Sequence, residues 1–365
     1  MDKPLIIAYY LPQYHPIPEN DEWWGKGFTE WTNVAKAKPL FKGHYQPKIP
    51  ADLGFYDLRV PEVREQQAEL AREAGVDGFC YWHYWFGNGK ELLERPFKEV
   101  VKSGKPDFPF CLGWANESWA AKIWNNQSVK SKKILIQQTY PGEEDIEKHF
   151  YSLLEAFKDN RYIKINNQPI FHIYQPLSHP DIKLFIKKWN ELIHKENIAN
   201  KFFFIAEAND SNFSEMKDLG FDATIIHQTE RMEKPYKNKN IFLRALHYFL
   251  RLTIKKTILI SYKDCLKYLW NEKIDSNEFV IPTLLPNWDH SPRSGNTYSI
   301  LTNSTPKLFK KLCIQVLNGI KKKRNKIVFI KSWNEWGEGN YMEPDLQFGK
   351  GYIKALAEAK KEIYP

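Results

Sequence analysis

Cysteine is scarce in this 365-residue chain, which has only Cys80, Cys111, Cys265 and Cys313. They are far apart and form no CxxC pair, so neither a zinc site nor a disulfide framework is predicted. No HExxH run is present either, and the sequence requires no metal and no cofactor. A GxGxxG run and a DxD motif are also missing, which argues against a dinucleotide-binding fold and a nucleotide-sugar site.

Long uncharged stretches are absent too, so no segment is predicted to span a bilayer. The apolar run at the N-terminus is about seven residues long and lacks a signal-peptide cleavage region, so a cytoplasmic location is expected. Basic residues outnumber acidic ones, 53 to 44, and the net charge is +9. The excess lies in scattered lysines, as at 130–133 and 321–324, without the fingerprint of a nucleic-acid module. We therefore expect solvated faces rather than a nucleic-acid partner.

Aromatic residues, in contrast, are abundant: 13 Trp, 19 Tyr and 23 Phe make up 15% of the chain. Many stand in polar company, as at 21–24, 81–85 and 116–119. Bulky core packing is one explanation for such abundance. Amphipathic rings beside hydrogen-bonding groups are also typical of a carbohydrate groove, because a pyranose has an apolar face and a polar rim.

The run SWNEWGEG at residues 332–339 is the most informative motif. It follows a short apolar stretch that predicts a buried strand, and it places Glu335 and Glu338 three positions apart. A β-turn would hold their Cα atoms within about 7 Å, with Gly337 at the position that favours positive φ. Two acids this close, walled by indoles, suit bond-breaking on a sugar. The alternative is a turn whose glutamates cap a helix or meet lysines.

Eight apolar runs alternate with helical patterns along the chain, which predicts an α/β fold, a closed parallel (β/α)8 TIM barrel. An open, doubly wound sheet is the runner-up. The predicted strands are 5–10, 76–82, 108–114, 169–174, 202–207, 221–226, 279–285 and 327–333. The predicted helices are 61–74, 91–103, 143–158, 181–195, 214–219, 241–268, 305–321 and 351–363. We expect one domain over 1–365, with insertions at about 11–60, 115–141 and 227–277, mostly long loops on the catalytic face.

Aromatic and hydrogen-bonding residues gather at the predicted C-terminal strand ends, where barrel enzymes keep their chemistry. The rings predicted to contact sugar, with plain packing as the alternative, are Tyr10, Trp82, Tyr84, Trp114, Trp288 and Trp336. The further candidates for substrate binding are His83, Asn116, Glu117, Tyr174, Glu207, Asp289, Arg293 and Asn334. For three of them a structural role is the alternative: His83 as a structural donor, Glu207 in a salt bridge, and Arg293 paired with Asp289.

Segments along nearly the whole chain resemble, in the same order, the WbsX-like proteins of bacterial polysaccharide gene clusters. These segments are YYLPQYHPIPENDEWWGKGFTEWTNV, DGFCYWHYWF, LERP, CLGWANESW, NWDHSPR and SWNEWGEGNYMEPD. Those proteins look like relatives of glycoside hydrolase family 99, the endo-α-mannosidases and endo-α-mannanases. Gly337 stands where those enzymes more usually have histidine.

The resemblance implies a retaining reaction in which Glu335 deprotonates the sugar 2-OH and Glu338 is the general acid/base. The 2-oxygen then attacks the anomeric carbon to give a 1,2-anhydro sugar. Such chemistry asks that Glu338 be held protonated and that the two pKa values differ. Asn334 would orient Glu335 or bind a hydroxyl. A second arrangement uses Glu117 as the acid and Glu335 as a nucleophile, about 5–5.5 Å apart.

The expected substrate is an oligosaccharide or polysaccharide, namely a bacterial surface polysaccharide or its precursor. Hydrolysis and transglycosylation share this chemistry, and a glycosyltransferase-type role in O-antigen or capsule biosynthesis is one alternative. A non-catalytic carbohydrate-binding barrel is the other. Residues 241–268 also show a basic amphipathic pattern. Packing against the barrel is the default explanation, and peripheral docking at the inner membrane is the second interpretation.

Overall fold

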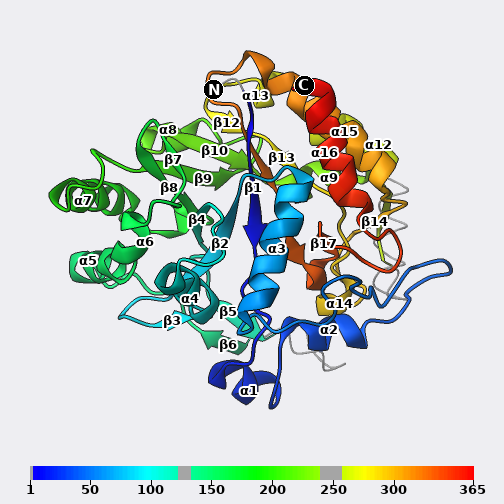
Figure 1. Cartoon of the computed structure of the whole chain (residues 1–365), viewed down its shortest axis with the longest axis horizontal. Helices are drawn as coiled ribbons and strands as arrows, with labels where there is room; N and C mark the ends of the chain where they lie inside the picture. Colours follow the sequence, from blue (N-terminus) through cyan, green and yellow to red (C-terminus); the bar gives the residue numbers. More distant parts are fainter. Residues whose placement is uncertain (1–2, 122–132, 239–256) are drawn as a thin grey trace.

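The computed structural model describes residues 3–121, 133–238 and 257–365. Their centre is a parallel barrel with helices around it (Figure 1). The strands follow one another in the order β12-β10-β9-β8-β4-β2-β1-β15-β13. Their bounds are β1 (Leu5–Tyr10), β2 (Gly78–Trp85), β4 (Phe110–Trp114), β8 (Gln168–Ile173), β9 (Phe203–Ala208), β10 (Ala223–Ile226), β12 (Val280–Ile281), β13 (Thr283–Leu284) and β15 (Ile327–Ile330). All eight predicted strand positions are confirmed.

The barrel closes through its seventh strand position, which Pro282 divides into β12 and β13. Strand β12 pairs with β10, while β13 pairs with β15. Proline has no N–H to donate to a ladder, but its carbonyl still accepts from Phe329 N at 3.1 Å. The two short strands therefore act as one and join the edges of the sheet. The open, doubly wound alternative is wrong.

The helices that cover the barrel lie where the sequence predicts them, with two corrections. Residues Glu91–Leu92 form strand β3, which pairs antiparallel with the end of β2, so the helix starts only at Arg95. The predicted helix over 143–158 is interrupted at Leu153. The covering helices are α3 (Pro61–Ala74), α4 (Arg95–Ser103), α5 (Glu143–Ser152), α6 (Leu154–Lys158), α7 (Ile182–Lys195), α8 (Glu215–Asp218), α15 (Pro306–Gly319) and α16 (Gly351–Ile363).

The connections carry short elements of their own, and one expectation about them fails. Of the predicted helix 241–268, residues 241–256 lie outside the described chain, and the remainder is strand β11 followed by helix α12. The strand forms because it pairs with β14. The short elements are α1 (Pro18–Trp24), α2 (Glu30–Lys36), β5 (Trp119–Ala121), β6 (Lys133–Ile136), β7 (Lys164–Ile165), α9 (Gln228–Met232), α10 (Lys234–Lys237), β11 (Leu259–Ser261), α12 (Tyr262–Leu269), α13 (Glu272–Asp275), α14 (Ser291–Ser294), β14 (Ile300–Thr302), β16 (Asn334–Glu335) and β17 (Asn340–Tyr341). None of the described helices has the length and apolar character to cross a membrane.

Alternation along the strands decides which side chains enter the barrel. On β1, Tyr9 faces inward and stacks on Trp82 of β2, with 4.7 Å between ring centroids and 1° between the ring planes. Its neighbour Tyr10 faces outward, where its hydroxyl donates to Gln67 of α3 at 2.6 Å. Adjacent residues at a strand tip therefore have different surroundings, and only every second one faces the interior.

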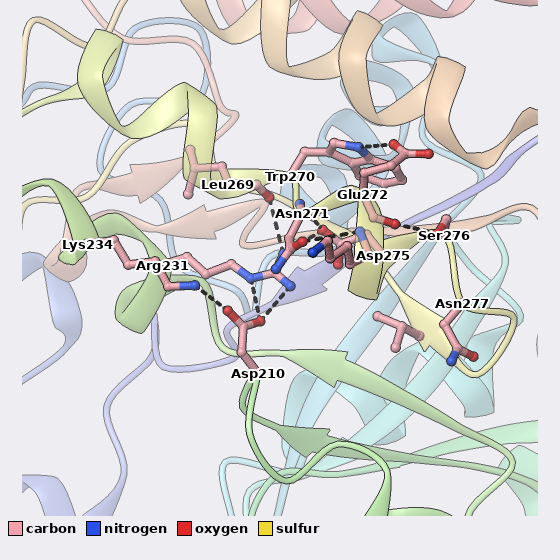
Figure 2. Close-up of polar contacts among 12 residues, drawn as sticks. Asp210, Arg231, Lys234, Leu269, Trp270, Asn271, Glu272, Asp275, Ser276 and Asn277 are labelled. Carbon is pink, nitrogen blue, oxygen red and sulfur yellow. Dashed lines mark hydrogen bonds and ion pairs between the residues drawn. The ribbon is translucent and has the colours of Figure 1, made fainter. Parts of the chain in front are cut away.

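A buried ionic cluster joins the connections around β9, β10 and β12 (Figure 2). Arg231 of α9 donates to Asp275 of α13 at 2.7 Å and to Asp210, after β9, at 2.8 Å. Lys234 also contacts Asp210, at 2.5 Å. The side chains of Arg231 and Asp275 have no exposed surface. Because a buried charge needs its partner, this cluster holds together the connection from β9 to β10 and the two ends of the connection from β10 to β12.

Candidate active site

The paired acids follow β15, at the C-terminal end of the barrel. Glu335 ends the short strand β16, and Glu338 ends the 3-10 turn Trp336–Glu338. The expected β-turn with positive φ at Gly337 is therefore wrong. The left-handed position belongs to Gly339, with φ +58°, which ends the 3-10 turn and lets β17 fold back against β16.

Arg293, from helix α14, joins the two carboxylates. Its guanidinium donates to Glu335 Oε1 at 2.8 Å and to Glu338 Oε1 at 2.7 Å, and its Nε donates to Glu30 of α2 at 2.9 Å. The alternative that Arg293 pairs with Asp289 is wrong. The side chains of Glu335, Glu338 and Arg293 are 10%, 16% and 21% exposed, so the group is sheltered but open to a ligand.

Gly337 is needed because nothing larger fits between this arginine and Glu30. A Cβ at this position would lie 1.9 Å from Glu30 Oε1 and 2.8 Å from Arg293 Nε. The glycine therefore allows a close approach rather than a special backbone angle.

The charges around the pair reverse the order of pKa values that the chemistry was expected to need. Burial, together with the nearby Glu338 charge, raises the pKa of Glu335 to about 7. Burial acts the same way on Glu338, but Arg293 and His290, 3.4 Å away, outweigh it and hold the pKa of Glu338 well below its usual range. These directions favour Glu335 over Glu338 as the carboxyl that carries the proton of the resting pair.

A second group of charged side chains lies around Glu207, at the end of β9. Glu207 is buried and lies 2.8 Å from His227 Nδ1 and 3.9 Å from Lys331 Nζ. Burial opposes its ionisation, but His227 and Lys331 lower the pKa of Glu207 to about 2. The predicted salt bridge at the barrel mouth is thus present. Tyr174 lies beside this group, with its ring 5.9 Å from that of His227.

Glu117 faces the same mouth from the connection after β4. Its Oε2 accepts from Gln175 at 3.0 Å. Burial and the charge of Glu338 raise the pKa of the Glu117 carboxyl. Glu117 is thus electrostatically coupled to the acid pair, while Gln175 and not Arg293 holds it.

Three residues proposed to contact sugar lie outside the barrel mouth because they occupy outward strand positions. Tyr10 is packed beneath α3 as described above. His83 Nε2 lies 2.8 Å from His149 Nε2 of α5. The Trp114 indole stacks on Phe185 and donates to a backbone carbonyl. The structure gives each of them a packing role.

Four other candidates are buried supports of the loops. Asn116 forms two hydrogen bonds with the backbone of Gln175, and Asn334 forms two with the backbone of Leu11. Asp289 accepts from Gln46 at 2.6 Å and contacts His44. The fourth, Trp336, stacks on Tyr341, and its indole donates to Glu343 at 2.7 Å. All four position the chain around the acids rather than face a ligand.

The remaining aromatic candidates do lie at the mouth. Trp82 is 5.7 Å from the ring of Tyr174, and Tyr84 packs against Trp119 of β5. The charges of Glu335, Arg293, Glu117 and Glu30 all act on the Tyr84 hydroxyl, whose pKa burial raises. Trp288 is covered by the ammonium of Lys331, 6.0 Å from its ring centroid.

Sequence reasoning missed Lys331 and gave Glu30 only a general place in a loop. Lys331 directly follows β15, so its position at a strand tip was a usable signal. Glu30 lies in α2, far from any strand, and only the folded chain brings it to Arg293. Among the described residues, no group of three or more His, Cys, Asp or Glu side chains is arranged to hold a metal ion.

Comparison with known proteins identifies the family. The model of the family described as glycosyltransferase WbsX matches residues 6–356. The chain belongs to the WbsX family. It is similar to the protein WxcX of Xanthomonas campestris pv. campestris, with 32% identity over 359 residues, which are 97% of this chain and 49% of WxcX. This WbsX chain thus spans about half the length of the curated relatives it matches.

Solved structures share the fold of this WbsX protein at low identity. A glycoside hydrolase-like protein superposes with a TM-score of 0.64 and 14% identity, covering 98% of this chain and 94% of its own. A family 99 endo-α-mannosidase from Bacteroides thetaiotaomicron has a TM-score of 0.59 and 13% identity, covering 98% of this chain and 97% of its own. These likenesses establish the (β/α)8 barrel architecture.

Proposed function

We propose that this WbsX barrel cleaves or transfers at a glycosidic bond, with Glu335 and Glu338 as its acid–base pair. The observation that carries the proposal is the convergence of both carboxylates on one guanidinium at the barrel mouth. Two carboxyl groups with separated pKa values can divide proton donation and proton removal between them. The substrate proposed is a saccharide of a bacterial surface polysaccharide or its precursor, a choice supported by the family.

The reaction proposed is retaining and uses the sugar's own 2-hydroxyl. One carboxylate takes the O2–H proton while O2 attacks C1, and the other carboxyl gives its proton to the departing oxygen. The C1–O bond to the leaving group breaks as the 1,2-anhydro ring forms. Water then opens that ring at C1 to complete hydrolysis, and a sugar hydroxyl in its place completes transfer. By family resemblance, Glu335 removes the proton and Glu338 gives one.

The proton must therefore move from Glu335 to Glu338 before the bond breaks. Arg293 can control this shift, because separate nitrogens bind the two carboxylates. A sugar that displaces the guanidinium from Glu338 alone would raise the pKa of Glu338, while the remaining contact keeps Glu335 acidic. The alternative acid, Glu117, has a raised pKa but is held by Gln175, away from Arg293. For this reason we favour the Glu335–Glu338 pair.

The glycosyltransferase description of the family favours transfer as the physiological outcome, and the same acid pair serves it. A saccharide acceptor bound at the mouth would compete with water for the anhydro sugar. Mixtures of donor glycoside and free oligosaccharide would show which product forms. Transfer products in excess of hydrolysis at millimolar acceptor would support this second candidate.

The proposal is tested with a panel of α-linked oligosaccharides and aryl α-glycosides, including α-mannosides. We expect Glu335→Gln and Glu338→Gln to lower turnover roughly 10²- to 10⁴-fold while glycan binding persists. Glu144→Gln, on an 85% exposed side chain, is the matched control and should match the wild type. NMR of the first product should show the retained anomer. Binding without any turnover by the wild type would instead support a carbohydrate-binding barrel.

A further inference from the structure

The ammonium of Lys331 lies at the barrel mouth, between Glu207 and the ring of Trp288. Its backbone N–H donates to Leu284 at 2.9 Å, so the chain is still in register with the barrel where this side chain leaves it. The side chain is 15% exposed, and its Nζ lies over the Trp288 ring. Burial opposes the charge of Lys331, but the charges of Glu207, Glu338, Glu335 and Glu117 outweigh it and raise the pKa of Lys331.

This ammonium has hydrogen-bonding capacity that the protein does not use. A lysine carries three N–H donors, yet among the described residues Lys331 Nζ donates no hydrogen bond, and the nearest carboxylate oxygen is Glu207 Oε1 at 3.9 Å. Glu207 is itself incompletely satisfied, because its buried Oε2 has no hydrogen-bond partner and lies 3.8 Å from His172 Nε2. Charged groups sheltered from water are normally paired and hydrogen-bonded. A ligand oxygen that accepts from Lys331 would supply the missing bond.

The Tyr174 hydroxyl is a second unused donor in the same place. The charges that act on it are those of Glu207, Glu117, Glu338 and Glu335, the same four that act on Lys331. Its ring is fixed at right angles to those of Trp82 and His227. Among the described residues, its hydroxyl has no hydrogen bond. Two donors therefore lie beside Glu207 and His227, and the charges of the acid pair act on both.

Charge decides which kind of oxygen fits these donors. Five carboxylates, including Glu30, surround the mouth, against the two permanent cations Lys331 and Arg293 and the imidazoles of His227 and His290, which add positive charge only when protonated. With one proton on the acid pair and both imidazoles neutral, the excess is negative, so a carboxylate or phosphate on the sugar would meet repulsion. A hydroxyl oxygen accepts from an ammonium without adding charge.

We propose that Lys331 is a specificity-determining residue, which together with Tyr174 donates to hydroxyl oxygens of the neutral sugar bound beside Glu335 and Glu338. The inference rests on the proposed function and adds the substrate class, a sugar without an acidic substituent at this position. Glu207 and Trp288 act as positioning residues that hold the ammonium in place.

The test compares Lys331→Met with wild type on 4-methylumbelliferyl α-mannoside and on the corresponding α-mannuronide. A contact made equally in the ground and transition states changes KM and leaves kcat unchanged. We expect KM for the mannoside to rise roughly tenfold, with kcat within about threefold, because one charged hydrogen bond is lost. Lys331→Arg should recover part of this loss. Lys187→Met, on a 73% exposed side chain, is the matched control.

A structural role for Lys331 would show itself differently. It would lower kcat and the melting temperature in Lys331→Met, and Lys331→Arg would not restore KM. Unchanged KM in Lys331→Met, or faster turnover of the mannuronide than of the mannoside by wild type, overturns the inference. If the Lys331 inference fails in this way, but wild type turns over a glycoside and Glu335→Gln does not, the proposed function still stands. If no glycoside of the panel is bound or turned over by wild type, both proposals fail.

Discussion

Arg293 shares its guanidinium among Glu30, Glu335 and Glu338, and this sharing sets how many protons the acid pair carries. The pKa of Glu335 is raised to about 7, while that of Glu338 is well below its usual range. Below pH 7 the pair therefore holds one proton. The reaction proposed above needs one proton as well, one carboxyl to give it and one carboxylate to receive the 2-OH proton.

The pH dependence of kcat/KM follows from this count, whichever oxygen holds the proton. We expect kcat/KM to fall above about pH 7, by about tenfold per unit, because both Glu335 and Glu338 are then ionised. Arg293→Met removes the cation that favours ionisation of the two acids. The fall of kcat/KM in this variant should therefore begin at a higher pH than in wild type, by on the order of one unit. Initial rates between pH 5.5 and 9 on an aryl glycoside measure both pH profiles.

The matched control for this prediction is Arg59→Met, whose arginine is 41% exposed and pairs with Asp57 on the surface. In this variant kcat/KM should fall at the same pH as in wild type. A wild-type profile that is flat to pH 9 would contradict the single-proton pair. If kcat/KM of Arg293→Met falls at the same pH as that of wild type, Arg293 does not set the ionisation of the acid pair.

Part of the candidate site was predictable from residue positions alone. Glu335 and Glu338 were found because strand ends gather at one rim and the acids lie in one short turn. The error over His83 was avoidable, because Trp82 and Tyr84 share a face that excludes the residue between them. The roles of Arg293 and Glu30 were not predictable, because their meeting depends on how two distant loops fold.

At the scale of elements, the turn that carries the acids is fixed from beneath by a buried carboxylate. Glu343 accepts hydrogen bonds from Trp336 at 2.7 Å, from Tyr56 at 2.9 Å and from Gln67 of α3 at 2.6 Å. Tyr14 adds a bond from its hydroxyl to the backbone carbonyl of Asn334. Helix α3 and the long connection after β1 therefore hold the turn in place. This connection thus helps to position the two acids.

The ionic cluster around Arg231 also holds connections of the barrel in place. Asp275→Asn should lower the free energy of unfolding by about 3 kcal/mol, because it leaves the buried guanidinium with only Asp210 as a charged partner. Asp264→Asn, an exposed acid on α12, should change it by less than about 1 kcal/mol. Urea unfolding followed by tryptophan fluorescence measures both.

Equal losses in Asp275→Asn and in Asp264→Asn would contradict a special role for the buried pair. Turnover provides a second observable. Because no side chain of this cluster contacts Glu335, Glu338 or Arg293 among the described residues, a destabilised Asp275→Asn that still folds should keep its pH profile. A shifted profile would mean that this cluster acts on the acid pair as well.

The elements themselves were largely predictable, because apolar runs and helical periods repeat eight times. The sequence did not show which strands pair with one another. Residues 91–92 become a strand only because the end of β2 is there to pair with them, and the segment at 259–261 becomes one because of β14. Pro282 in a barrel strand was tolerated because each half pairs with a different neighbour. The pairings of β11, β12 and β13 join residues far apart in the chain and leave no local signal, whereas β3 pairs with β2 across a short loop.

At the scale of the whole molecule, the barrel wall contains imidazoles that fold in their neutral form. His83 and His149 share one hydrogen bond, at 2.8 Å, amid the rings of Trp85 and Trp189. Burial lowers the pKa of His83 to about 3, and burial and the neighbouring His83 lower that of His149. His172, on β8, is also buried, and burial lowers its pKa to about 4. Low pH should therefore destabilise the fold, because these buried histidines resist protonation in the folded protein.

The sign follows from proton binding in the two states. An unfolded histidine has a pKa of about 6.5, so below that pH the unfolded chain binds protons that His83 and His149 cannot bind in the native state. Their contribution to stability is complete above about pH 6.5 and is lost as the pH falls toward their native pKa values. Between pH 7 and pH 5 this loss is about 2 kcal/mol per proton excluded.

Replacing both histidines with apolar side chains should remove this dependence. In His83→Leu/His149→Phe neither nitrogen is left without its partner, so we expect a free energy of unfolding within about 1.5 kcal/mol of wild type at pH 7.5. Between pH 7 and 5 the double variant should lose about 4 kcal/mol less than wild type, about 2 kcal/mol for each histidine. His149→Phe alone leaves His83 Nε2 buried without a partner and should be destabilised at every pH. Urea titrations at pH 7.5, 6 and 5 give all three values, and parallel curves for wild type and double variant would show that acid acts elsewhere.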